Sequence, residues 1–242
     1  MTFSIITVCF NCKDSIIKTI RSVFKQSCSD YEYLIIDGDS EDGTKEIIRK
    51  YEMRYPQIHV VSEPDDGIYD AMNKGVRLAK GDYVYFLNSG DSFYNSNVLE
   101  NVKNRVSTDA SVYFGRVKLL GLGVKTYPSK LNLFWLVYRE KMICHQAIFA
   151  RRDTLVQSPF DLKYKICADR DWLIKCVKSH KGIESIQPLI VAKYDPNGTS
   201  SCHSKFVEDS LSLARKYGGE KAILYIKLIR GLGYVAGKRY DD

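Results

Sequence analysis

Residues 67–91 read GIYDAMNKGVRLAKGDYVYFLNSGD, a helical pattern followed by a strand pattern that ends in a polar turn. The helical pattern covers residues 67–79, and residues 82–88 form the strand. Within that strand every residue from Tyr83 to Leu87 is aromatic or aliphatic, which is typical of a strand covered on both faces. The chain becomes polar at the next position, Asn88, so a core strand ends directly in amide and carboxylate side chains.

The same alternation of strand and helix extends over the first half of the chain. Strand patterns are followed by amphipathic helical stripes, each with apolar residues three and four positions apart. This order predicts an α/β fold with a mostly parallel sheet and helices on its faces. The expected strands are 4–10, 31–37, 58–63 and 111–120, and the expected helices are 15–26, 44–55 and 97–106.

The second half is less regular. We expect a strand at 145–152, a helix at 168–180, and an extended segment at 183–194 in which Pro188 indicates a sheet edge or a break. Two helices, 205–218 and 220–235, follow. The organisation we predict is an α/β domain over residues 1–204 and a C-terminal helical extension over 205–242.

Composition narrows the class of protein. The net charge of +7 favours partners such as nucleotide phosphates or anionic lipid headgroups. Nucleic acid is a weaker candidate because zinc-finger spacing and RNA-recognition signatures are absent from the sequence. The sequence contains no run of 18 apolar residues and begins without a signal-peptide pattern. Its seven scattered cysteines suit a reducing cytoplasm.

Polar residues follow each of the first four predicted strands. They are Asn11, the DGDSEDGT stretch 37–44, the SEPDDG stretch 62–67 and the NSGD stretch 88–91. Parallel strands place their carboxyl ends at one edge, where ligands of open α/β sheets bind. Converging carboxylates without a Cys/His set indicate a hard cation, Mg²⁺ or Mn²⁺, bridging to substrate phosphates. Neither a P-loop nor a GxGxxG fingerprint is present to hold a nucleotide.

Four stretches occur in a characteristic order: SIITVCFN (4–11), LIIDGDSEDGT (34–44), the 63–91 segment beginning EPDDGIYDAMNKG, and ADRDWLI (168–174). Together they resemble family 2 inverting glycosyltransferases of the GT-A fold, and most closely the members that assemble bacterial polysaccharides. The resemblance covers roughly residues 3–200, and its most specific part is the EPDDGIYDAMNKG motif. It implies a GT-A catalytic domain over residues 1–204, with a nucleotide-sugar half at about 1–120 and an acceptor half at about 121–204.

The resemblance implies a role for residues at the strand ends. Thr7 and the nearby backbone would line the nucleotide pocket. Asp37 would accept a hydrogen bond from N3–H of uracil, which favours a UDP-sugar, and Asp65 and Gly67 would approach the nucleoside. The full set expected to bind the nucleotide-sugar is Thr7, Asn11, Asp37, Asp65, Gly67, Asn73, Asn88, Ser89 and Gly90.

Three positions depart from the family pattern. Asn88 and Gly90 stand where the metal-binding segment usually carries carboxylates, so Asp91 alone keeps a charge there. The resemblance therefore implies a weak Mg²⁺ or Mn²⁺ site at Asp91, assembled with the substrate. Met72 stands where many relatives have an arginine, just before Asn73, so one cationic contact to the nucleotide-sugar is missing.

Inverting transfer needs a carboxylate that takes the proton of the attacking hydroxyl. Asp169 lies three residues before Trp172, on the inward face of the predicted helix, and is either this base or an N-terminal cap. We favour the base. Asp171 falls on another face and is expected to be solvated or paired with Lys175, and Arg170 is expected to be a surface charge.

Other segments bear on the acceptor side. His145 and Gln146 match a recurring HQ pair of these relatives, with a role near the acceptor or the diphosphate, or a purely structural one. The DPNGTS stretch 195–200 resembles a loop that closes over the donor. The apolar and basic tail 221–240 suits either an interfacial membrane helix, at the inner face of the plasma membrane, or packing on the domain or a second subunit.

These observations predict an inverting glycosyltransferase that moves a sugar from a UDP-sugar to a saccharide acceptor, with a lipid-linked acceptor expected. Two alternatives remain open. A sugar nucleotidyltransferase would need a glycine-rich basic loop after the first strand, which CFNCKDS (9–15) does not offer. A non-catalytic nucleotide- or glycan-binding domain would lack turnover, so Asp169 distinguishes it from an enzyme.

Overall fold

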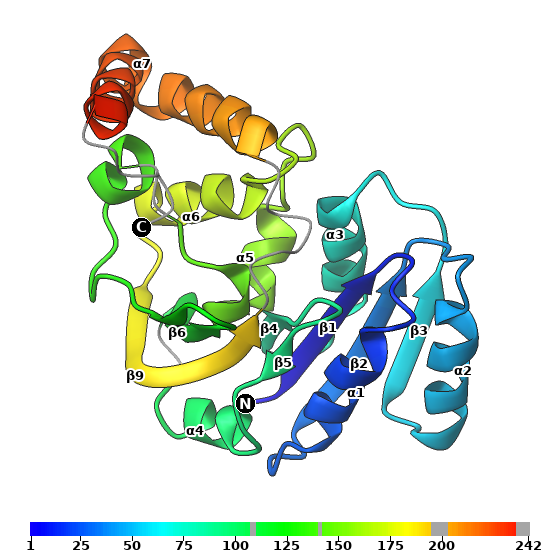
Figure 1. Cartoon of the computed structure of the whole chain (residues 1–242). Helices are drawn as coiled ribbons and strands as arrows, with labels where there is room; N and C mark the ends of the chain where they lie inside the picture. Colours follow the sequence, from blue (N-terminus) through cyan, green and yellow to red (C-terminus); the bar gives the residue numbers. More distant parts are fainter. Residues whose placement is uncertain (107–109, 140–141, 195–202, 236–242) are drawn as a thin grey trace.

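The structure is a computed structural model that describes residues 1–106, 110–139, 142–194 and 203–235 (Figure 1). The DPNGTS stretch and residues 236–242 of the tail lie outside these ranges. The strands are β1 (Phe3–Cys9), β2 (Tyr31–Asp37), β3 (Ile58–Ser62), β4 (Tyr83–Phe86), β5 (Ser92–Phe93), β6 (Val112–Leu119), β7 (Gly123–Lys125), β8 (Ile148–Arg151) and β9 (Ile183–Tyr194). The helices are α1 (Ile16–Phe24), α2 (Thr44–Arg54), α3 (Ile68–Leu78), α4 (Val98–Lys103), η1 (Phe134–Tyr138), η2 (His145–Ala147), α5 (Arg152–Gln157), α6 (Ala168–Lys178) and α7 (His203–Val235).

One mixed sheet organises these elements, in the order β3-β2-β1-β4-β8-β6-β9-β5, with β7 paired to β6. The first four strands are parallel, β8 runs antiparallel to both β4 and β6, and β6 and β9 are parallel to each other. The predicted fold class, a mostly parallel α/β sheet flanked by helices, is therefore confirmed. The predicted strand at 145–152 is shorter than expected, because residues 145–147 form the short helix η2.

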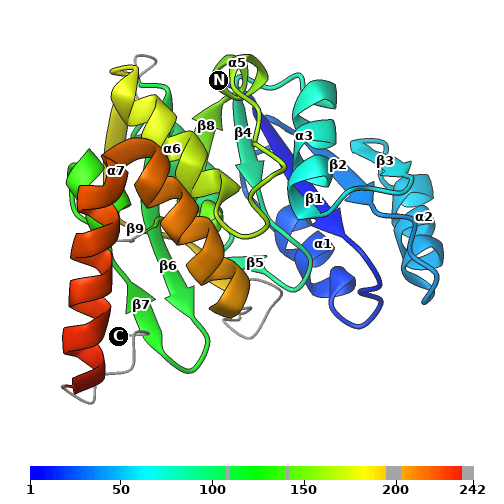
Figure 2. The same ribbon diagram turned by 90° about the horizontal axis from the view of Figure 1, so that it is seen from above.

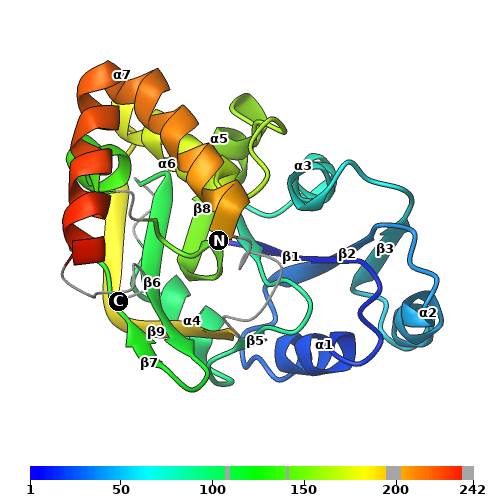
Figure 3. The ribbon, with the colours of Figure 1, turned by 45° about the horizontal axis from the view of Figure 1, so that its top comes forward.

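The parallel half is held by apolar strands covered on both faces. Every residue of β1 is buried, and α1 and α2 lie on one face of the sheet while α3 lies on the other (Figure 3). Gly75 lets α3 approach closely, since a Cβ at this position would lie 2.6 Å from a methyl carbon of Ile6. This contact fixes α3 against β1. The same helix also contacts residues in the second half of the chain.

Pro188 interrupts the pairing of β9, as the sequence predicted. Residues 183–185 pair with Val112–Phe114, and pairing resumes only at Ile190, opposite Arg116. The strand thus advances five residues while β6 advances two. Proline has no amide hydrogen for the ladder, and it lies inside the skipped segment.

The two predicted C-terminal helices are the two arms of α7, which bends at Gly219 (φ 64°, ψ −163°) (Figure 2). The first arm lies beside α6, and the second arm packs against η1, where the Tyr225 ring lies 5.7 Å from that of Phe134. In the part of the chain that the structure covers, no helix has both the length and the apolar character needed to cross a bilayer.

Candidate active site

The carboxyl ends of β1, β2, β3 and β4 form one continuous rim. The loop after β3 is bonded to the end of β2, because the amide of Glu63 donates to the carbonyl of Asp37 at 3.0 Å. The segment after β1 meets the turn after β4, where the hydroxyls of Ser15 and Ser89 lie 3.1 Å apart. The convergence predicted from the strand ends is therefore present in the fold.

Two predicted nucleotide residues lie inside this rim. Asp37 is 1% exposed, and its Oδ2 accepts bonds from the Ser40 amide at 3.0 Å and the Ser62 hydroxyl at 2.7 Å. Thr7 is fully buried and donates to the carbonyl of Leu87 at 2.7 Å. In this structure both side chains organise the loops, and their contact with a nucleotide stays a prediction.

Three further predicted residues lie at the open side of the rim. Asn11 is exposed, adopts φ 47°, and its Oδ1 accepts the Glu41 amide at 2.9 Å. Asp65 is half-buried, and its Oδ1 accepts the amide of Gly67 at 2.9 Å. The other oxygen of Asp65 lies beside Gly38, where a Cβ would approach it to 2.6 Å. Asp65 is thus the carboxylate at the opening of the rim.

The turn after β4 spans Asn88 to Asp91 and is held by the HQ pair. Gly90 supplies the left-handed conformation of this turn, with φ +93°. The amide nitrogen of Asn88 lies 2.9 Å from Nε2 of His145, and Nε2 of Gln146 donates to Oδ2 of Asp91 at 2.8 Å. Burial lowers the pKa of His145 to about 4, so the ring is neutral at pH 7 and can accept from the Asn88 amide.

The described residues provide few ligands for a divalent cation. Among them, no three His, Cys, Asp or Glu side chains gather closely enough to hold a metal. Asp91 is 6% exposed and shares one oxygen with Gln146, while the buried Oδ1 of Asn88 has no hydrogen-bond partner within the described ranges. One carboxylate and one amide oxygen fit a cation shared with a substrate diphosphate, and do not make a complete protein site.

Asp169 lies at the first turn of α6 and is 2% exposed. Its Oδ1 accepts the amide of Arg170 at 2.7 Å and lies 3.2 Å from the hydroxyl of Tyr69. Burial raises the pKa of Asp169 to about 7, although these two donors act to lower it. A carboxyl group with a pKa near neutrality suits proton transfer at pH 7.

A small cavity of about 10 Å³ lies beside this carboxyl group. Asp169, Trp172, His145 and Phe160 line it together with other apolar residues, and His145 also contacts Asn88 of the turn after β4. Oδ2 of Asp169 and Nε1 of Trp172 are both buried without a hydrogen-bond partner in the described part of the chain. One unpaired acceptor and one unpaired donor thus belong to side chains that line the same cavity.

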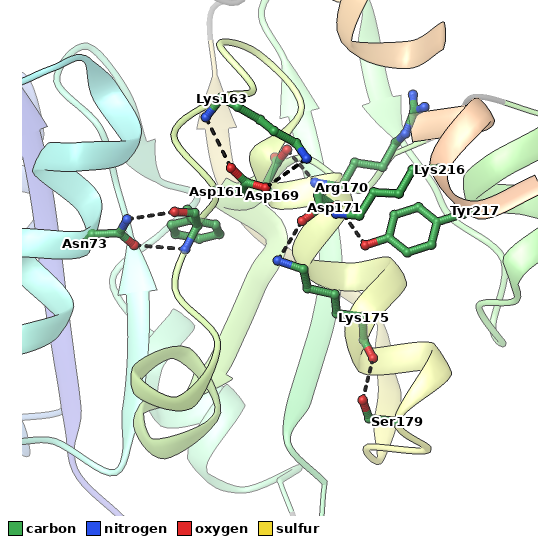
Figure 4. A network of polar contacts seen from close by, with 11 residues as sticks. Asn73, Asp161, Lys163, Asp169, Arg170, Asp171, Lys175, Ser179, Lys216 and Tyr217 are labelled. Atoms are coloured by element: carbon green, nitrogen blue, oxygen red, sulfur yellow. Dashed lines mark hydrogen bonds and ion pairs between the residues drawn. The ribbon is translucent and has the colours of Figure 1, made fainter. Parts of the chain in front are cut away.

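The prediction that Arg170 is a surface charge was wrong. Arg170 is fully buried and donates to the hydroxyl of Ser210 at 2.9 Å. Of the two alternatives for Asp171, pairing with Lys175 is confirmed, with Nζ at 2.8 Å, and the solvated one is wrong because the side chain is fully buried. Lys216 of α7 lies 2.8 Å from the other oxygen of Asp171 (Figure 4). Both residues are buried because α7 covers the side of α6 that a solitary helix would expose.

Asn73, expected to bind the nucleotide-sugar, joins α3 to the loop before α6. It is 7% exposed, and its amide makes two bonds with the backbone of Phe160, at 2.9 and 3.0 Å (Figure 4). In this structure its side chain fixes that loop, and its contact to a nucleotide stays a prediction. Lys74 does not replace the missing arginine, because it is paired with Glu63 at 3.0 Å and Asp70 at 3.5 Å. Sequence reasoning missed Tyr69, which is on the face of α3 four residues before Asn73.

A rim of polar strand ends beside a buried carboxyl group is the arrangement of a sugar-transferring enzyme of the GT-A type. Residues 4–157 match the model of the family described as Glycosyl transferase family 2. The chain belongs to this family, as its sequence motifs predicted.

Curated relatives agree with this assignment. A PGL/p-HBAD biosynthesis glycosyltransferase of Mycobacterium bovis (strain BCG / Pasteur 1173P2) is 30% identical over 200 residues, covering 81% of this chain and 77% of the relative. A putative teichuronic acid biosynthesis glycosyltransferase, TuaG of Bacillus subtilis (strain 168), is 42% identical over 91 residues, covering 37% of this chain and 36% of the relative.

Solved structures share the fold at low sequence identity. TarS 1–349 of S. aureus in complex with UDP-GlcNAc superposes with a TM-score of 0.70 and 18% identity, covering 93% of this chain and 70% of that one. Against the longer TarS structure the TM-score is 0.68 at 19% identity, covering 90% of this chain and 39% of that chain. The mannosyltransferase PcManGT of Pyrobaculum calidifontis, in complex with GDP-Man and Mn²⁺, gives a TM-score of 0.65 at 14% identity, covering 98% of this chain and 76% of that one. The GT-A fold is thereby confirmed.

Proposed function

We propose that this protein is an inverting glycosyltransferase that moves a sugar from a UDP-sugar to a saccharide hydroxyl in the assembly of a polysaccharide or glycolipid. The observation that carries the proposal is the buried Asp169, with one carboxyl oxygen unpaired, beside a cavity that is also lined by His145, a neighbour of the turn at 88–91. The relatives named for glycolipid and teichuronic acid synthesis support the class of product.

The chemistry follows from the position of Asp169. The acceptor hydroxyl donates to Oδ2 of Asp169 and accepts from Nε1 of Trp172. As its oxygen attacks the anomeric carbon, its proton passes to Oδ2, and the bond between that carbon and the diphosphate breaks with both electrons leaving on UDP. A single displacement of this kind inverts the anomeric configuration. A base with a pKa near 7 contributes about 10²–10⁴-fold to the rate of such a step.

The donor occupies the rim in this proposal. Asp65 and Gly67 contact the nucleoside, and the turn at 88–91 faces the diphosphate. A divalent cation brought by the diphosphate would take Asp91 and the amide oxygen of Asn88 as its protein ligands and neutralise charge on the leaving group. The structural relatives that contain UDP-GlcNAc, and GDP-Man with Mn²⁺, support a nucleotide-sugar at this edge.

A donor screen tests this function. We expect UDP with Mn²⁺ to raise the melting temperature of the protein, and one UDP-sugar to be hydrolysed slowly without an acceptor. Asp65→Asn should abolish the stabilisation by UDP, whereas Asp66→Asn, at the exposed neighbouring position, should preserve it. Stabilisation by GDP and not by UDP would refute the base assignment, and stabilisation by neither would refute the nucleotide site.

The acceptor is proposed to be lipid-linked and to be met at the cytoplasmic face of a membrane. The second arm of α7 carries Leu224 and Leu228, which are 71% and 59% exposed, and the same arm carries the exposed Lys221 and Lys227. Phe134 of η1, 51% exposed, lies against the same arm. Apolar side chains flanked by lysines are typical of contact with an anionic lipid surface.

The double variant Leu224→Asp/Leu228→Asp should therefore lose binding to vesicles that contain anionic lipid. Each buried leucine contributes about 1.5–3 kcal/mol, so the loss should exceed roughly tenfold in partition coefficient. Vesicle sedimentation measures it, with Met53→Asp as the control because Met53 is 81% exposed on the distant helix α2. Unchanged sedimentation of the double variant would exclude this face as the membrane contact.

A further inference from the structure

Helix α3 contacts the segment that carries the general base, although the two are about ninety residues apart in sequence. The hydroxyl of Tyr69 donates to the carbonyl of Ile166 at 2.6 Å and lies 3.2 Å from Oδ1 of Asp169. One turn further along α3, the amide of Asn73 makes its two bonds with the backbone of Phe160. The start and the end of the loop that leads into α6 are thus both fixed by one helix.

The spacing of these residues explains how one helix does this. Tyr69 and Asn73 are four residues apart and share a face of α3. Gly75 lies on the face that packs against β1, where it meets Ile6. The amino end of α3 follows Gly67 and Asp65 at the open side of the rim. The helix therefore spans from the proposed donor site to the proposed base.

The contact with Tyr69 is asymmetric at the carboxyl group. Oδ1 of Asp169 accepts from the Arg170 amide and lies 3.2 Å from the Tyr69 hydroxyl, whose single proton it shares with the carbonyl of Ile166, whereas Oδ2 has no partner among the described residues. Both Tyr69 and Asp169 are more than 90% buried, so no bulk water competes for these contacts. Both contacts fall on one oxygen and restrict the rotation of the carboxyl group, and the other oxygen is left for a ligand.

We propose that Tyr69 is a positioning residue for the general base. Its hydroxyl holds Asp169 so that Oδ2 faces the cavity, and Asn73 supports it by fixing the preceding loop. This inference rests on the proposed function, because it assumes that Asp169 accepts the proton. It assigns the YDAMN part of the motif to the base, where the sequence had suggested the nucleotide.

The pH dependence of the reaction reports on this contact. The groups facing Asp169 are Tyr69 of α3, Arg170 and Cys167 at the start of α6, and His145 across the cavity. The hydroxyl of Tyr69 lowers the pKa of Asp169 from the value that burial would impose. Removing it should raise this pKa, so that less of the carboxylate form exists at pH 7 and more alkaline solution restores it.

Tyr69→Phe tests the inference. We expect kcat at pH 7 to fall about tenfold or more, as for the loss of one hydrogen bond to a charged group. The acidic limb of the kcat profile should move to higher pH, and the dissociation constant for UDP should stay within about twofold of wild type. The control is Tyr83→Phe, which loses a buried bond from a tyrosine hydroxyl to the carbonyl of Ala110, 3.0 Å long and outside the site.

The outcomes separate the inference from the proposed function. An unmoved pH profile in Tyr69→Phe, or the same loss in Tyr83→Phe, overturns the positioning role while wild-type turnover stands. Absence of turnover in the wild type with every nucleotide-sugar overturns the proposed function itself. If Tyr69→Phe does not fold, the variant Asn73→Asp tests the inference instead, because it removes the amide that donates to the carbonyl of Phe160. A lower kcat with unchanged UDP affinity in Asn73→Asp supports the inference, and weakened UDP affinity with unchanged kcat contradicts it.

Discussion

Replacing Asp169 with asparagine is expected to reduce kcat for sugar transfer by about 10²–10⁴-fold, the usual contribution of a general base. Asparagine has nearly the same shape and can keep the bond from the Arg170 amide, but it cannot take the proton of the acceptor hydroxyl. Since Asp169 belongs to α6 and not to the strand-end segments that form the rim, UDP affinity should remain within about twofold of wild type. Steady-state transfer assays and UDP titration measure the two quantities.

The matched control for this variant is Asp153→Asn, an exposed carboxylate on α5 near Arg152. It should have wild-type kcat. Loss of UDP binding in Asp169→Asn would mean that the residue has a structural role. Full activity in Asp169→Asn would show that Asp169 is not the general base. If both wild type and variant bind UDP but neither transfers a sugar, the protein is the non-catalytic binding domain that the sequence analysis kept as an alternative.

The largest expected effect on stability comes from the buried charge of Asp171. Lys175 and Lys216 each lie 2.8 Å from one of its oxygens, and the hydroxyl of Tyr217 lies 2.8 Å from the oxygen that Lys216 also contacts. Removing both cations in Lys175→Met/Lys216→Met leaves a fully buried carboxylate without a counter-charge. We expect the free energy of unfolding at pH 7 to fall by about 3–5 kcal/mol, measured by urea denaturation.

Each single variant should lower the free energy of unfolding much less, because the remaining lysine can still compensate the charge of the carboxylate. Lys163→Met, which removes an exposed pair with Asp161, should change stability by less than about 1 kcal/mol. A double variant as stable as Lys163→Met would contradict the importance of this cluster.

The cluster also predicts how stability depends on pH. Burial acts to raise the pKa of Asp171, but the bonds from Lys175, Lys216 and Tyr217 outweigh it, so the folded pKa lies below the ordinary value. A depressed folded pKa means that the stabilisation is present above the unfolded pKa of about 3.9 and is lost as the pH falls through the folded value. The double variant should lack this component of the acid transition.

The first half of the fold could be predicted from the sequence because its signals are local. The apolar run 83–87 and the stripes of α1 and α2 specify strands and helices within a few residues, and the order of elements specifies a parallel sheet. The rim follows from that topology alone. Asp169 could be placed inward because a single helix face carries both it and Trp172.

The remaining features depend on contacts between distant segments. The burial of Arg170 and Asp171 could not be predicted because α7, about forty residues later, buries the side of α6 that they occupy. The contact of Asn73 could not be predicted because its partner is the backbone of Phe160, and a backbone partner leaves no signal in the sequence. Tyr69 carried no signal of its own, although its spacing from Asn73 on a helix could have suggested a shared partner.

The structure explains part of the departure from the family pattern. Asn88, in place of a carboxylate, lies beside the neutral His145, and Gln146 bonds to Asp91. The unprotonated Nε2 of a neutral imidazole can accept from this amide, whereas a carboxylate at position 88 would require the other tautomer, with the proton on Nε2. Nothing in the structure explains Met72 beyond its full burial against the core.

The most direct test of the central claim is a crystal structure of the protein with the UDP-sugar that the donor screen identifies. The account predicts that the diphosphate lies against the turn at 88–91 and that the anomeric carbon faces the cavity lined by Asp169 and Trp172. A donor bound elsewhere, or bound with its anomeric carbon turned away from Asp169, would contradict the account.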